Sequence, residues 1–219
     1  MTVESETLQQ LERMLSEGKT TGEIRVYLAE SNPIFLAENN PIPRQNIRNF
    51  ISECASKFRI NFPVVDIGCG YRSNKPEIAL SWGSDPTFKY IAFDHSADFD
   101  HPIDPKAALD LLADALQVPF PDFFASTVVC TEVLEHVADD RRVLQEVFRI
   151  LKNSGLFILT LPGKDIPKHE KLPYQVDYRR YNQEQITRLL SSFGFRDIEV
   201  VERCFAGFQV NIFATCKKP

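Results

Sequence analysis

The chain has 219 residues, of which 43% are hydrophobic, so it can bury the core of one domain with some additions. Its formal net charge is −5 and no block of Lys and Arg stands out, so no nucleic-acid partner is expected. No apolar run reaches the length of a membrane span, and the acidic residues 1–12 lack the apolar region of a signal peptide.

The five cysteines are scattered along the chain, with no C-x-x-C pair and an odd total. This usage is typical of a reducing compartment and argues against a zinc site. We therefore expect a cytoplasmic protein without a structural metal.

Residues 1–62 are predicted to form an N-terminal helical extension. Leu8, Leu11 and Leu15 mark one face of a first helix, and a second short helix is expected over residues 24–28. Apolar residues recur at helical spacing over 47–58 and predict a third, amphipathic helix. These helices either only cover an edge of the sheet, or cap a substrate pocket, or pair two copies of the chain as a homodimer.

From Phe62 onward, strand patterns alternate with helical ones, which predicts an α/β fold with a doubly wound, mostly parallel seven-stranded sheet. The strands are expected over residues 63–67, 90–93, 109–113, 127–131, 156–161, 198–201 and 209–216. Helices are expected over 139–152 and 183–192. Ligands bind such sheets at the carboxyl ends of the strands, so residues 63–219 are predicted to be the ligand-binding domain.

The first strand runs into a glycine turn, Gly68-Cys69-Gly70. Glycine lets the backbone turn sharply and lets a ligand lie directly on it. A dinucleotide-binding turn would place a third glycine where Ser73 stands, and the carboxylate of Asp66 would repel a pyrophosphate. Asp66 suits instead a ligand with a cationic end, such as an amino acid.

Three carboxylates, Asp66, Asp94 and Asp114, follow three successive strands. A carboxylate after the second strand can accept both ribose hydroxyls, and one after the third can accept from the amino group of adenine. Each acid alone fits a turn or a helix cap, but three at successive strand ends are harder to explain in that way.

The glycine turn resembles the D-x-G-x-G-x-G motif of class I S-adenosylmethionine-dependent methyltransferases. Residues 114–122 and 128–137 are similar to the D-x-x-x-L-P-F-x-D and V-V-x-x-x-V-L-E-H-V patterns of the type 11 family, and residues 151–155 to its L-K-P-G-G turn. Residues 169–181 resemble an H-E-x-P-x-D-Y-x-R-Y-T signature of type 11 members linked to bacterial surface glycans. The resemblance covers residues 63–200.

This resemblance implies a Rossmann-like methyltransferase fold and methyl transfer from S-adenosylmethionine to the oxygen or nitrogen of a small molecule or glycan precursor. The residues that it implies for the cofactor are Asp66, Gly68, Cys69, Gly70 and Arg72 at the methionine end, Asp94 and His95 at the ribose, Asp114 and Ala115 at the adenine, and Cys130, Thr131 and Glu132 along the fourth strand.

The chain departs from the family pattern at two positions. Arg72 occupies the third glycine of the turn, where its side chain either crowds the cofactor or grips the methionine carboxylate. Ser126 stands where an acid usually begins the fourth strand, which concerns local structure.

The candidate catalytic bases are His136, His169 and Tyr181, together with Tyr178. We expect residues 163–181 to form a mobile lid of little regular structure that supplies acceptor contacts. His136 fits a structural role at a helix start, and the two tyrosines fit packing of the lid. Two further functions stay open: a non-catalytic protein of the same fold that binds a partner through residues 1–62, and a nicotinamide-dependent oxidoreductase.

Overall fold

The computed structural model describes residues 41–58, 60–70, 89–95, 110–166, 176–205 and 207–219, and the single residues 13, 16, 17, 78 and 168. The two helices predicted near Leu8 and over 24–28 lie outside the described residues, as does the pairing surface proposed for them. The third predicted helix is present as α4 (Pro41–Lys57) and begins earlier than expected.

The described strands form one sheet in the order β3-β2-β1-β4-β5-β7-β6. Strands β1 to β5 pair in parallel, and β7 runs antiparallel to both of its neighbours. The strands are β1 (Val64–Ile67), β2 (Tyr90–Asp94), β3 (Leu111–Leu112), β4 (Ala125–Thr131), β5 (Leu151–Pro162), β6 (Arg196–Phe205) and β7 (Phe208–Lys217). The predicted mostly parallel, seven-stranded Rossmann-like sheet is confirmed.

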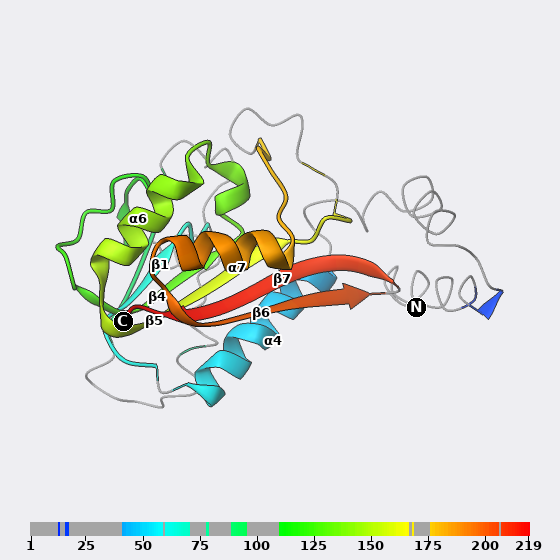
Figure 1. The fold of residues 1–219 in the computed structure, drawn as a ribbon, viewed down its shortest axis with the longest axis horizontal. Helices are drawn as coiled ribbons and strands as arrows, with labels where there is room; N and C mark the ends of the chain where they lie inside the picture. Colours follow the sequence, from blue (N-terminus) through cyan, green and yellow to red (C-terminus); the bar gives the residue numbers. More distant parts are fainter. Residues whose placement is uncertain are drawn as a thin grey trace.

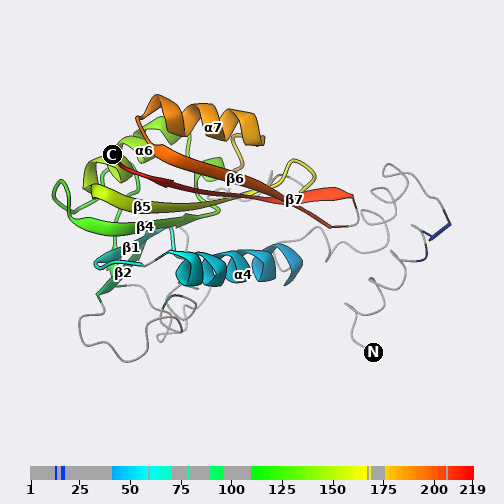
Figure 2. The ribbon, with the colours of Figure 1, turned by 60° about the horizontal axis from the view of Figure 1, so that its bottom comes forward.

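Helices cover both faces of this sheet (Figure 1). Figure 2 shows α4 against one face, with α6 (Asp140–Ile150) and α7 (Gln183–Ser192) against the other. Local chemistry fixes where these two helices start. The Asp139 side chain caps α6, and Asn182 with Gln185 forms a capping box on α7.

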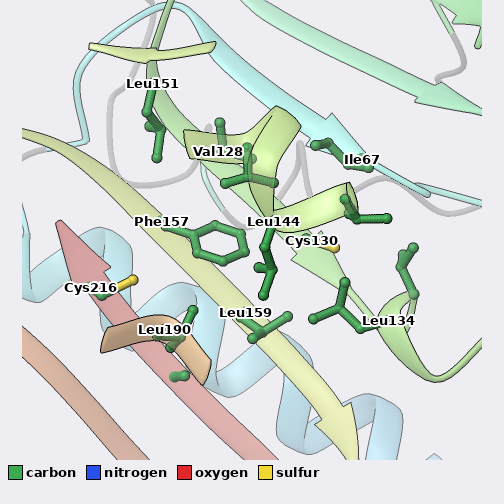
Figure 3. Close-up of a cluster of buried hydrophobic side chains, with 14 of the residues drawn as sticks. Ile67, Val128, Cys130, Leu134, Leu144, Leu151, Phe157, Leu159, Leu190 and Cys216 are labelled. Atoms are coloured by element: carbon green, nitrogen blue, oxygen red, sulfur yellow. The ribbon is translucent and has the colours of Figure 1, made fainter. Parts of the chain in front are cut away.

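The face beneath α6 and α7 holds the larger core. In Figure 3, Leu144 of α6 and Leu190 of α7 lie over Phe157 of β5, with Val128 of β4 and Cys216 of β7 beside them. All five side chains are at most 1% exposed. The apolar alternation of β4 and β5 therefore buries one set of side chains here and the other set under α4.

The prediction that helix α6 runs to Lys152 was wrong. The helix ends at Ile150, and Leu151 takes an extended conformation and pairs with Ala125 at the start of β4. Strand β5 thus begins five residues earlier than the apolar run at 156–161 indicated.

Helix α4 is fixed to the sheet by one aromatic stack and by several polar contacts. The rings of Phe50 and Phe213 lie parallel with centroids 4.4 Å apart, and the Asn46 side chain donates to Asn211 of β7 at 3.2 Å. Ion pairs Lys57–Glu199 and Glu53–Arg203 extend the contact to β6; these two pairs are solvent-exposed and contribute little. Ile51, Cys54 and Ala55 of α4 are also buried against the sheet in the smaller core, so apolar contacts carry most of the attachment.

No helix in the described part of the chain is long and apolar enough to cross a membrane.

Replacing Phe213 with Ala should lower the free energy of unfolding by about 3–5 kcal/mol, because a large buried ring leaves a cavity under α4. Urea denaturation measures the loss. Val201→Ala on β6, where the side chain is 45% exposed, is the control and should change stability by less than about 0.5 kcal/mol. Equal losses in both variants would show that α4 is not held through Phe213.

Candidate active site

The turn after β1 is built on two glycines in the left-handed conformation, Gly68 with φ 68° and Gly70 with φ 55°. The N–H groups of Gly68 and Cys69 both donate to the carbonyl of Phe93 in β2, at 2.9 and 3.1 Å. A Cβ on Gly68 would lie 2.2 Å from Cγ2 of Val133, so the turn touches the chain two residues past the end of β4. A Cβ on Gly70 would meet no atom of the described residues within 4 Å. Among the described residues there is therefore no room for a side chain at position 68, whereas there is room for one at position 70.

The strand-end carboxylates lie where the sequence predicted them, and each already holds a local contact. Asp94 accepts from the Gly70 N–H at 2.5 Å and from the His95 N–H at 2.7 Å, which ties the turn to β2. Asp66 is fully buried and accepts from the Tyr90 hydroxyl at 2.5 Å. These two acids and the glycine turn share one edge of the sheet because β1 and β2 are parallel neighbours.

The third acid begins the segment that the D-x-x-x-L-P-F-x-D resemblance covers. Asp114 accepts from the Leu116 N–H at 2.8 Å, and Ala115 lies in the turn between them. Helix α6 fixes the rest of this segment. Glu146 accepts from the Val118 N–H at 2.9 Å, and Arg149 donates to the Phe120 carbonyl at 2.7 Å.

Glu146 and Arg149 of α6, which bind the backbone of this segment, also form an ion pair with each other. Arg149 donates to both carboxylate oxygens of Glu146, and this bond lowers the pKa of the Glu146 carboxyl. Arg149 also reaches Asp122 at 2.9 Å. The polar face of α6 therefore positions the loop that begins at Asp114.

Neither cysteine of the predicted cofactor set has the character of a nucleophile. Burial raises the pKa of the Cys69 thiol, and the carboxylates of Asp66 and Asp94 raise it further. Burial likewise raises the pKa of Cys130, which is fully enclosed in the core. Both stay thiols at neutral pH and act by packing.

The end of β4 holds a strained residue. Glu132 has φ 55° although it carries a side chain, and residues in this region cluster at functional sites. Its N–H donates to the Thr160 carbonyl at 3.0 Å and its carboxylate accepts from the Thr160 hydroxyl at 2.8 Å. Thr131, just before it, is half-buried. The chain then turns sharply into η2 (Leu134–His136).

Four ionisable side chains meet behind this turn, and we call them the acid–imidazole cluster: Glu135, His136, Asp177 and Arg180. Nδ1 of His136 lies 2.9 Å from Asp177, Asp177 pairs with Arg180 at 2.5 Å, and Nε2 of His136 lies 3.6 Å from Glu135. Burial raises the pKa of the Glu135 carboxyl well above its usual range, and the charge of Glu132 raises it further. Sequence reasoning missed Glu135, and it placed Asp177 in the lid without a partner.

Residues 176–181 dock along residues 134–140. The Tyr178 N–H donates to the Glu135 carbonyl at 2.8 Å, and Arg179 donates to the carbonyls of Val137 and Ala138 at 2.7 and 2.6 Å. Tyr181 is 7% exposed, lies in the larger core, and donates to Asp140 at 2.6 Å. Burial and this bond raise the pKa of the Tyr181 hydroxyl, which favours packing over the role of a base.

The other end of the predicted lid is also anchored. The Gly163 N–H donates to the Val210 carbonyl at 2.9 Å, the Lys164 N–H to the Gln209 side chain at 3.1 Å, and the Gln209 N–H to Asp165 at 2.8 Å. Both described ends of residues 163–181 are thus held by hydrogen bonds, and the mobility of the segment stays a prediction. His169 and Arg72 lie outside the described residues, so their predicted roles stay predictions.

Replacing Gly68 with Ala should destabilise the protein by about 2–4 kcal/mol, because left-handed strain and overpacking against Val133 add. Gly194→Ala is the matched control: Gly194 also has a positive φ of 88°, but its Cβ would lie 3.7 Å from Phe148. Only the strain then remains, at about 1–2 kcal/mol. Chemical denaturation measures both, and equal losses would exclude a tight contact between the turn and Val133.

The sequence model of the type 11 family, described as a methyltransferase domain, matches residues 65–159. A probable S-adenosylmethionine-dependent methyltransferase of Mycobacterium tuberculosis is 32% identical over 93 residues, which are 39% of this chain and 32% of that protein. A similar protein of Mycolicibacterium smegmatis is 31% identical over 86 residues, or 36% of this chain and 32% of that protein. The chain thus spans about a third of the length of these relatives.

Two solved structures share the fold. A methyltransferase of Archaeoglobus fulgidus superposes with a TM-score of 0.62 and 16% identity, over 80% of this chain and 94% of that one. Phosphoethanolamine N-methyltransferase 2 of Haemonchus contortus, solved with S-adenosylmethionine, gives a TM-score of 0.60 at 16% identity, over 89% of this chain and 60% of that one. With the glycine turn and the strand-end acids, residues 65–159 are thus similar to the methyltransferase domain of the type 11 family of class I S-adenosylmethionine-dependent methyltransferases, and the solved structures share the fold.

Proposed function

We propose that the protein transfers the methyl group of S-adenosylmethionine to a hydroxyl or amine of a small molecule or glycan precursor. The observation that carries this proposal is the open side of the glycine turn at Gly70, beside the strand-end carboxylate of Asp94. A ligand on this turn would lie directly on backbone, with an acid of β2 within reach of its hydroxyls.

The donors present fit this cofactor from end to end. Asp66 is buried under the turn, so it contributes negative charge toward a methionine ammonium group, and Gly68, Cys69 and Gly70 offer backbone. Asp94 and His95 serve the ribose. Asp114 and Ala115, on the loop that α6 clamps, serve the adenine. Thr131 and Glu132 line the site from the end of β4, with Cys130 packed behind them. We extend the methionine set to Arg72 from the sequence alone.

A sulfonium methyl group is already electrophilic, so the chain's own work is to align the acceptor with it and to exclude water. The anchored ends of residues 163–181 support such alignment, since each is tied to a strand or to the turn after β4. A base is required only where the acceptor must lose a proton.

We also propose a cytoplasmic location. All five cysteines belong to the described residues and all are free, and four of them are buried. Unpaired thiols in this number are typical of a reducing compartment. The homodimer through the N-terminal helices stays a prediction from the sequence.

Isothermal titration with S-adenosylmethionine, its demethylated product and NAD tests the proposal. The first two should bind with dissociation constants on the order of micromolar, about −8 kcal/mol, and NAD should give no heat. A labelled-methyl assay against a panel of hydroxyl and amine acceptors then tests turnover. Heat with NAD and none with S-adenosylmethionine would sink the proposal.

Asp94→Ala should weaken S-adenosylmethionine binding by roughly tenfold or more, since hydrogen bonds to a charged group are worth about 1.5–3 kcal/mol. Because Asp94 also accepts from Gly70, thermal unfolding should be followed in parallel. Asp197→Ala, whose side chain is 71% exposed on β6, is the control and should bind normally. Unchanged affinity in the Asp94 variant would remove the ribose assignment.

A further inference from the structure

Strand β7 carries two buried side-chain amides near its start, Gln209 and Asn211. Strand alternation places both on the sheet face that α4 covers, where the ring of Phe213 stacks on Phe50. Gln209 accepts from the Lys164 N–H at 3.1 Å and so holds the loop after β5. Asn211 is fully buried and bonds to no such loop among the described residues, so its amide needs another explanation.

The Asn211 amide is satisfied on one side. Nδ2 of Asn46 in α4 donates to Oδ1 of Asn211 at 3.2 Å, whereas Nδ2 of Asn211 is buried and has no hydrogen-bond partner among the described residues. Two facing amides can close a ring of two hydrogen bonds, and this pair makes one. A buried donor without a partner is costly, and such a group points to a ligand or a water that completes it.

Asn211 lies at the same edge of the sheet as the glycine turn. Antiparallel pairing puts it opposite Pro162, the last residue of β5, just as Phe213 lies opposite Thr160. The Thr160 hydroxyl in turn donates to Glu132, which directly follows β4. Strands β4, β5 and β7 are neighbours, and strands lie about 4.8 Å apart, so Asn211 is two strand spacings, roughly 10 Å, from the end of β4.

The surroundings of the Asn211 amide suit an uncharged ligand that approaches from the amino end of α4. Asn46 is half-buried, so solvent comes within one side chain of the amide. Arg203 is the cross-strand neighbour of Asn211 on β6, and it pairs with Glu53 of α4 at 3.1 Å. The two charges beside the amide therefore cancel, and neither favours an ionic group.

We propose that Nδ2 of Asn211 donates to a hydroxyl oxygen of the methyl acceptor, with Asn46 as the positioning residue that orients the amide. A hydroxyl suits this pair because it accepts from Nδ2 and can donate in return to Oδ1 of Asn46. The inference rests on the proposed function and narrows it: besides its reacting atom, the acceptor carries an uncharged hydroxyl about two strand spacings, roughly 10 Å, from the end of β4. An extended, hydroxyl-rich molecule such as a sugar derivative meets both requirements.

Thermal unfolding of the cofactor-free protein tests whether the amide lacks a partner. Asn211→Leu removes the buried donor at nearly constant volume and should keep or raise the melting temperature. Gln209→Leu is the matched control, because it removes a buried amide of the same strand that does have a partner, and it should lower Tm by about 2–4 °C. An equal fall in Asn211→Leu would make the amide a structural group held by the fold or by a bound water, and would overturn the proposal.

Nitrogen-15 NMR of the side-chain amides tests binding without the natural acceptor, and Asn211→Leu assigns the signal. Methyl α-glucopyranoside is the hydroxyl-bearing probe, added in the upper millimolar range because small fragments bind weakly. It should shift the Asn211 signal in wild type and shift it less in Asn46→Ala. Tetramethylammonium has no hydrogen-bonding atom and should leave the signal in place. A signal that the glucoside does not move, or that both probes move alike, overturns the hydroxyl site.

Turnover separates this inference from the proposed function. With an acceptor found by the labelled-methyl panel, Asn211→Leu should raise KM by about 3- to 10-fold, the worth of one hydrogen bond, with kcat and S-adenosylmethionine affinity nearly unchanged. An acceptor analogue without the hydroxyl should lose that factor with wild type and nothing further with Asn211→Leu.

An unchanged KM, or losses that simply add, overturns the contact between Asn211 and the acceptor. Failure of the wild-type protein to bind S-adenosylmethionine overturns the proposed function instead. The unfolding and NMR experiments then still decide whether Asn211 binds a hydroxyl, since neither requires turnover.

Discussion

The chain can pass from β1 across the end of β4 only because residue 68 has no side chain. A Cβ there would overlap Val133, and the backbone has the positive φ that glycine adopts without strain. The same turn is tied sideways to β2 by the Phe93 carbonyl and the Asp94 carboxylate. The carboxyl ends of β1, β2 and β4 are thereby held together, and the candidate site is built on these strand ends.

The layers on the two faces of the sheet support that edge from different directions. On one face the polar side of α6 clamps the loop after Asp114 through Glu146 and Arg149. On the other face α4 rests on the Phe50–Phe213 stack. Neither contact reaches Gly70, where an added Cβ would meet no atom of the described residues within 4 Å. Packing therefore supports this edge of the sheet and leaves space at Gly70. The D-x-x-x-L-P-F-x-D pattern has a plain physical role here, since its backbone groups are the ones that α6 binds.

Residues 176–181 dock along residues 134–140, and this docking buries charged side chains away from water. Arg179 is satisfied by carbonyls, and Asp177 by Arg180, but Glu135 keeps a buried oxygen without a partner among the described residues. An apolar cluster of similar volume would cost less to bury. Such an arrangement, beside a strained Glu132, is typical of positions where function is kept at some cost in stability.

Local patterns in the sequence determined several helices and strands of the fold, and the part of the site formed by the glycine turn and Asp94. The predicted bounds of α7 match because Asn182 and Gln185 cap it, and β1, β2 and the glycine turn follow from an apolar run ending in Asp66 and Gly68. These features depend on neighbours within a few residues, so periodicity and turn chemistry suffice to find them. The placement of Asp94 at a strand end follows in the same way.

Only the tertiary structure decided the rest, because the contacts concerned join residues far apart in the chain. Leu151 leaves its helix to pair with Ala125, and the Tyr181 hydroxyl finds Asp140 across 41 residues, which changes a candidate base into a core residue. Asp177 meets His136 in the same way. No local pattern encodes which side chain a docked segment will face. That choice is made by packing, which here buries the Asp177 carboxylate beside the His136 imidazole.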